Sequence, residues 1–170
     1  MTEHCGNIVV LGLGNLILSD EGLGVRAAHR LLADPRLPAG VEVIDGGTLG
    51  LELLSMAAGA RRMLVLDAVD VEGEPGTFFR FDHDKLRDLA RGSTAHQLGV
   101  ADLLAALRMM GQEPDEVVLL GLQPESLHLG TELTPAVAAS LDGLVDAAVS
   151  ELRRWDPPSE ERHRQCTKSG

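Results

Sequence analysis

Two carboxylates and one imidazole in this chain of 170 residues have the side-chain types and the placement of a metal site. Glu21 follows the first apolar run and its glycine loop, Asp67 interrupts the apolar run MLVLDAV, and His96 opens a helical pattern in TAHQLG. A carboxylate in a buried strand costs free energy unless it is paired or coordinated. Because ligands bind beyond the carboxyl ends of parallel strands, a strand order beginning 2-1-3 would bring these groups together. Two oxygens and one nitrogen would suit a divalent transition-metal ion.

Each of these residues also has a simpler structural interpretation. Asp20 can cap a helix, and Glu21 can complement the positive end of the helix dipole. A histidine that opens a helix, as His96 does, often only caps it or contacts solvent. Spacing alone leaves both interpretations open. The other histidines lack acidic neighbours at an expected strand end, and we assign no role to any of them: His4, His29, His83, His128 and His163.

The glycine loop after the first apolar run invites comparison with a phosphate-binding loop. Gly12 and Gly14 fit the first two positions of the G-x-G-x-x-G pattern, but Ile17 occupies the third. The loop contains no lysine, and Asp20 and Glu21 would repel a pyrophosphate at a helix N-terminus. The sequence therefore disfavours a nucleotide-binding regulator.

Apolar strands alternate with amphipathic helices, which predicts an α/β fold around a mainly parallel twisted sheet of about five strands. The expected strands are 7–11, 41–45, 63–69, 77–81 at an edge, and 116–122. The expected helices are 21–32, 49–58, 99–110 and 134–155, the last with Thr134 as its N-cap. We expect residues 1–155 to form one domain and residues 156–170 to be a mobile tail.

Composition narrows the classes of function. A net charge of −11 argues against binding to nucleic-acid phosphates. No apolar run approaches the roughly 18 residues that cross a bilayer, and Glu3 and His4 stand where a signal peptide carries basic residues. Cys5 and Cys166 have no metal-ligand spacing, which favours a reducing compartment. We expect a cytoplasmic monomer that binds neither nucleic acid nor a membrane.

Several separated motifs carry a resemblance to a known family. The segments GLGNLILSDEGLGV, DGGTLGLELL, LVLDAV, HQLGVADLLAAL, LLGLQPESL and LTPAV occur in that order between Ile8 and Leu152. In this order they resemble the nickel-iron hydrogenase maturation endopeptidases. The resemblance implies a three-layer αβα sandwich. It also implies an enzyme that removes the C-terminal extension of the nickel-loaded hydrogenase large-subunit precursor.

The resemblance also implies roles for individual residues. The family's metal-contacting residues match Glu21, Asp67 and His96, and nickel is expected to arrive with the substrate, so that the free enzyme can be metal-free. The segment Asp45, Gly46, Gly47 and Thr48 matches the part associated with substrate recognition and cleavage. Asp45 would be a substrate contact or a base. No serine triad or H-E-x-x-H helix is present, and the alternative activity is a nickel or maturation chaperone that docks the precursor without cleaving it.

Overall fold

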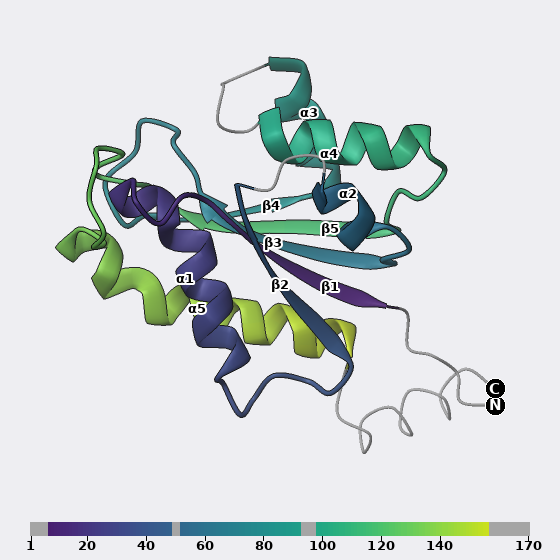
Figure 1. Cartoon of the computed structure of the whole chain (residues 1–170), viewed down its shortest axis with the longest axis horizontal. Helices are drawn as coiled ribbons and strands as arrows, with labels where there is room; N and C mark the ends of the chain where they lie inside the picture. The colour runs from purple at the N-terminus through teal and green to yellow at the C-terminus, as the bar shows by residue number, and fades with distance from the viewer. Residues whose placement is uncertain (1–6, 49–51, 93–97, 157–170) are drawn as a thin grey trace.

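The computed structural model describes residues 7–48, 52–92 and 98–156. One sheet lies between two layers of helices, as Figure 1 shows. This three-layer αβα arrangement confirms the fold class expected from the sequence.

The sheet has five strands in the order β2-β1-β3-β5-β4. The strands are β1 (Ile8–Leu13), β2 (Val41–Gly47), β3 (Arg62–Ala68), β4 (Phe78–Asp82) and β5 (Glu116–Leu122). All neighbours pair in parallel except β4, which runs antiparallel to β5 at an edge of the sheet. The order confirms the 2-1-3 start on which convergence of the candidate site depends.

The helices divide between the two faces of the sheet (Figure 1). One face is covered by α1 (Leu23–Leu32), which follows the short 3-10 turn η1 (Ser19–Gly22), and by α5 (Pro135–Trp155). The other face is covered by α2 (Glu52–Ala57), α3 (His83–Gly92) and α4 (Leu98–Met109).

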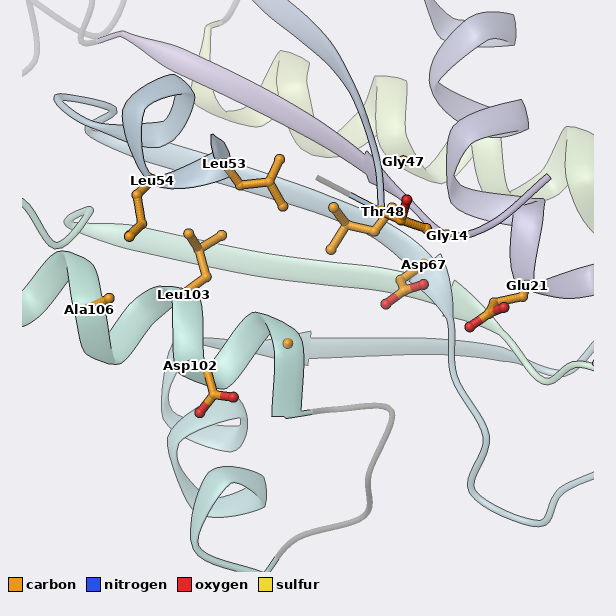
Figure 2. Close-up of a pocket in the computed structure, with 12 residues that line it drawn as sticks. Gly14, Glu21, Gly47, Thr48, Leu53, Leu54, Asp67, Asp102, Leu103 and Ala106 are labelled. Carbon is orange, nitrogen blue, oxygen red and sulfur yellow. The ribbon is translucent and has the colours of Figure 1, made fainter. Parts of the chain in front are cut away.

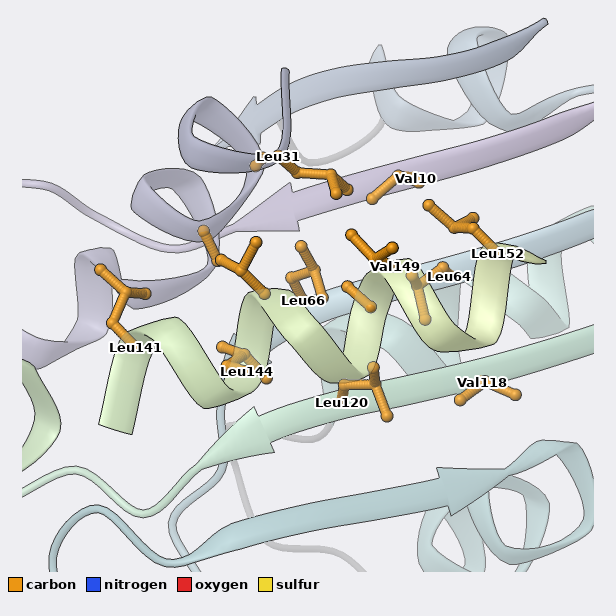
Figure 3. Packing of buried hydrophobic residues seen from close by; sticks show 14 of the residues in the cluster. Val10, Leu31, Leu64, Leu66, Val118, Leu120, Leu141, Leu144, Val149 and Leu152 are labelled. Atoms are coloured by element: carbon orange, nitrogen blue, oxygen red, sulfur yellow. The ribbon is translucent and has the colours of Figure 1, made fainter. Parts of the chain in front are cut away.

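Alternate residues of each central strand enter different cores. In β3, Leu64 and Leu66 pack with Leu144 of α5, as Figure 3 shows, whereas Met63 and Val65 pack with Leu107 of α4. Because both faces of the sheet are covered, the central strands form continuous apolar runs rather than alternating ones.

The expected elements exist, with small shifts at their ends. The strand at 116–122 has the expected bounds, and β2 continues two residues further, to Gly47. The first helix begins as η1, so Glu21 lies in a 3-10 turn and not in the α-helix. Helix α3 was not expected, because its sequence HDKLRDLARG is strongly polar.

Two expectations fall on residues that the structure does not describe. Residues 49–51 of the expected helix at 49–58 are outside the described ranges, and so is the tail from residue 157 onward. The extent of the domain and the mobility of the tail stay predictions. In the described ranges, no helix combines the length and the apolar character needed to cross a membrane.

Candidate active site

The glycine loop after β1 serves close packing. Gly14 has a φ of +124°, and a Cβ atom there would lie 1.7 Å from the carbonyl oxygen of Glu21. A Cβ on Gly24 would lie 2.0 Å from the carbonyl oxygen of Leu66. Only glycine tolerates such backbone approaches. These contacts bring the turn that carries Glu21 against the ends of β1 and β3.

Asp20 is a buried structural carboxylate. It accepts hydrogen bonds from the backbone N–H groups of Glu125 (2.9 Å), Ser126 (3.0 Å) and Thr134 (2.8 Å), and from the Thr134 hydroxyl (2.8 Å). The simpler interpretation of Asp20 as a helix cap is therefore wrong, because its oxygens bind a different loop. Thr134 does occupy the N-cap position of α5, but its side chain accepts no hydrogen bond from the helix N–H groups, and its hydroxyl donates to Asp20.

A second set of bonds joins the same two loops. The Ser19 N–H donates to the Gly130 carbonyl at 2.8 Å, and the Ser19 hydroxyl donates to the His128 carbonyl at 2.9 Å. Ser19 has a φ of 50°, a left-handed conformation that is uncommon for a residue with a side chain. Strained backbone of this kind persists only where surrounding contacts enforce it. Glu21 therefore projects from a turn fixed on both sides.

Glu21 and Asp67 line one pocket of about 410 Å³ at the carboxyl ends of the strands. Figure 2 shows the two carboxylates near each other. Gly14, Gly47 and Thr48 lie on the wall near the carboxylates, and leucines from β1, α2 and α4 form much of the remaining wall. The strand order thus joins two of the residues that the sequence singled out.

The pKa of Asp67 is raised to about 7, well above its usual value. Burial of the carboxyl group is the main cause; the hydrogen bond from the Ala68 N–H opposes it, and the negative charge of Glu21 adds to it. A carboxyl group whose pKa is raised by burial and by a neighbouring negative charge in a pocket is typical of functional sites. A bound cation would relieve both the burial cost and the repulsion.

The third expected ligand cannot be placed. His96 lies within residues 93–97, outside the described residues. Among the described residues, no group of three His, Cys, Asp or Glu side chains is close enough to hold a metal ion. The oxygen donors of Glu21 and Asp67 fit a divalent ion, and the contribution of His96 stays a prediction.

The DGGT segment divides between two faces of the sheet. Gly47 and Thr48 line the pocket, and a Cβ on the buried Gly46 would lie 2.8 Å from a methyl carbon of Leu13. Asp45 is not among the residues that line the pocket: its carboxylate lies 2.8 Å from Nε2 of His29, on the α1 side.

Two histidines have acidic partners that the sequence analysis did not anticipate. His29 pairs with Asp45 at the end of β2, and His83 Nε2 lies 3.0 Å from a carboxylate oxygen of Glu113. The expectation that these histidines lack acidic neighbours at a strand end is therefore wrong for His29, whereas the partner of His83 precedes β5 and is not at a strand end. The partner of His29 is 16 residues away and that of His83 is 30, so only the fold joins them.

Asp102 is a pocket residue that the sequence analysis missed. It lines the pocket from α4 together with Gly99, Leu103 and Ala106. These positions share one helical face, at spacings of three, four and seven residues. The spacing of residues in the helix expected at 99–110 was therefore enough to place Asp102 on the same face as the other three.

Comparison with known proteins gives a consistent result. The family model described as hydrogenase maturation protease matches residues 25–151. The hydrogenase expression/formation protein HupD of Rhodobacter capsulatus is 40% identical, over 87% of this chain and 72% of that protein. The hydrogenase 2 maturation protease of Escherichia coli (strain K12) is 39% identical, over 86% of this chain and 90% of that protein.

Solved structures agree in both sequence and fold. The hydrogenase maturating endopeptidase HybD from E. coli superposes with a TM-score of 0.80 at 38% identity, covering 87% of this chain and 93% of that chain. At this similarity the two chains share the same overall fold. The chain belongs to the hydrogenase maturation protease family, and it is a peptidase.

Proposed function

We propose that this endopeptidase removes the C-terminal extension of a [NiFe] hydrogenase large-subunit precursor, and that nickel already bound to the precursor is the element it recognises. The observation that carries this proposal is the pair of carboxylates, Glu21 and Asp67, in one pocket at the carboxyl ends of the sheet. The proposal includes a cytoplasmic reaction by a monomer.

The two carboxylates are the protein's contribution to binding the nickel of the substrate. Without a cation, the raised pKa keeps Asp67 partly protonated near neutral pH. Binding of the nickel-loaded precursor lowers that pKa and releases the proton, because metal ligands bind in their deprotonated form. His96 is proposed as the third ligand.

Hydrolysis breaks the C–N bond of the scissile amide, adds water oxygen to the carbonyl carbon and transfers a proton to the leaving amine. The reaction requires an activated water and stabilisation of the developing oxyanion. The nickel of the substrate, if held by Glu21 and Asp67, would supply positive charge for both tasks. Glu21, which projects from the turn fixed by Asp20, would be one of the residues that hold it.

The DGGT segment is proposed to hold the precursor's backbone beside the carboxylates. Gly47 and Thr48 are on the pocket wall, and the Gly47 carbonyl already accepts a hydrogen bond from Gly14 at 3.1 Å. The Asp45 side chain is 46% exposed and is held by His29. An exposed, anchored carboxylate suits a contact with the substrate better than a base acting inside the pocket.

The proposal is tested with purified protein and its cognate precursor, prepared with and without nickel. Mass spectrometry should show loss of the C-terminal extension from the nickel-loaded precursor and no change in the nickel-free one. The variant Glu21→Gln, which removes one proposed nickel ligand, should bind the loaded precursor more weakly and should not cleave it. Equal cleavage of both precursors would contradict the proposal that nickel is recognised. Binding of the loaded precursor by the unmodified enzyme without any cleavage product would favour the chaperone alternative.

A further inference from the structure

The pocket at the candidate active site has two chemically different parts. Glu21 and Asp67 lie toward one end, and Figure 2 shows leucine and alanine side chains toward the other. We call this second part the apolar arm. It is formed by Leu13, Leu53, Leu54, Leu103 and Ala106.

The apolar arm is built into the core. Leu53 of α2 is 7% exposed and Leu103 of α4 is 6% exposed, and both belong to the apolar cluster on this face of the sheet. Leu13 and Leu54 are partly buried and pack against the same cluster. The arm is therefore the part of the pocket lined by α2, α4 and the end of β1, and the core holds its walls in place.

Chemistry and size indicate what the arm holds. A volume of about 410 Å³ falls in the range of sites that bind organic ligands, and is more than a metal ion and one peptide group require. Water in a space lined by leucine and alanine finds few hydrogen-bond partners, so an apolar group displaces it favourably. The carboxyl group of Asp102 belongs to an exposed residue and so is at the rim.

We infer that the apolar arm binds an aliphatic side chain of the precursor, on a residue that flanks the scissile bond. This inference rests on the proposed function and adds a specificity pocket to it. The occupant follows from continuity: the same pocket holds the carboxylates, so a chain whose amide reaches Glu21 and Asp67 places its neighbouring side chain in the arm. Burial of that side chain holds the amide in position for hydrolysis.

A matched pair of variants tests the arm. Ala106→Leu fills it from α4, whereas Ala105→Leu adds the same side chain one residue earlier, at an exposed position outside the pocket. The helix propensities of the two changes are the same. Melting temperatures close to that of the unmodified protein verify that both variants fold.

The substrates are nickel-loaded precursors with Gly, Ala, Val, Leu, Met or Phe at each residue flanking the scissile bond, which is first mapped by mass spectrometry. For the unmodified enzyme, we expect kcat/KM to rise from Gly to Leu at one flanking position by about 10- to 200-fold. Ala106→Leu should lose most of that gain and prefer Ala, while Ala105→Leu should keep the original order. Leu54→Ala, which enlarges the arm, should shift the preference toward Met and Phe.

The outcomes separate this inference from the proposed function. If the unmodified enzyme cleaves the precursor but is indifferent to both flanking side chains, the arm is not a specificity pocket and the function stands. Identical substrate preferences in Ala106→Leu and Ala105→Leu would also overturn the inference about the arm. If the unmodified enzyme cleaves no precursor, the proposed function and the inference built on it are both rejected.

Discussion

The carboxylate of Asp20 accepts hydrogen bonds from both the backbone N–H and the hydroxyl of Thr134, a residue 114 positions away. Together with the bonds from Glu125 and Ser126, this joins the turn that carries Glu21 to the loop before α5. The residue before the candidate nickel ligand thus holds the ligand's backbone in place. Although the Asp20 side chain does not line the pocket, we expect its substitution to lower the activity of the site.

Removal of this buried carboxylate should destabilise the protein. Asp20→Ala leaves buried donors without acceptors, and we expect a loss of about 3 kcal/mol in the free energy of unfolding. Thr134→Val removes one hydroxyl donor and should cost about 1 kcal/mol. Urea unfolding measures both, with Thr131→Val, at an exposed position in the same loop, as the control. If Asp20→Ala were as stable as the unmodified protein, the hydrogen bonds of Asp20 between the two loops would contribute nothing to the free energy of unfolding.

Two glycine substitutions should have opposite effects. Gly14→Ala places a Cβ 1.7 Å from the Glu21 carbonyl oxygen at a φ of +124°, so the turn must move; stability and precursor cleavage should both fall. Gly143→Ala in α5, where a Cβ meets nothing within 4 Å, should stabilise the helix by about 1 kcal/mol and leave cleavage unchanged. Thermal unfolding and the cleavage assay check both. Unchanged cleavage in Gly14→Ala would show that the turn does not position Glu21.

The pKa of Asp67 predicts a pH dependence of stability for the metal-free protein. Because that pKa is raised from 3.8 to about 7, the folded state holds the proton more tightly than the unfolded state does. Stability should therefore fall as the pH rises from about 4 to about 7, by at most about 4 kcal/mol. Asp67→Asn keeps an acceptor for the Ala68 N–H and removes the charge, so it should be the more stable protein at pH 8.

The advantage of Asp67→Asn should shrink as the pH falls toward 4, where the carboxyl group of the unmodified protein is protonated. Urea unfolding at a series of pH values measures the difference. A constant difference across this range would contradict a raised pKa. Added nickel should stabilise the unmodified protein at pH 8 and leave the variant unchanged.

Asp102 should contribute to recognition and not to folding. It is exposed on α4 and lines the pocket, so its charge adds to the negative potential that attracts a metal-bearing substrate. Asp102→Asn should lower kcat/KM for the nickel-loaded precursor by about 3- to 10-fold at low salt, with a smaller effect at high salt. Asp84→Asn, at an exposed position of α3, is the control of equal charge. Equal rates for the two variants would exclude a role for Asp102.

Local patterns in the sequence were enough to predict most of the fold. The run EVVLLGL gave the bounds of β5 because both of its faces are buried, and the 2-1-3 strand order put Glu21 and Asp67 in one pocket. Helix α3 was missed because it is strongly polar, and it packs through residues such as Leu86. A hydrophobic pattern does not reveal a helix of this kind.

Contacts between distant segments were beyond sequence reasoning. The partners of Asp20 are more than 100 residues away, and His29 meets Asp45 only because α1 packs beside the end of β2. Asp102 is different, because the helical spacing of the pocket residues in α4 could have predicted from the sequence that it shares their face. Buried carboxylates therefore divide into two kinds that look alike in sequence: Asp20 binds backbone donors, whereas Asp67 faces a pocket.

The central claim is that the carboxylates of Glu21 and Asp67 bind the nickel through which the precursor is recognised. Anomalous diffraction from crystals soaked in nickel or cadmium tests it most directly. We expect one peak within about 2.0–2.2 Å of an oxygen of each residue, lost in the Glu21→Gln, Asp67→Asn double variant. A peak elsewhere, or the same peak in the double variant, would contradict the claim.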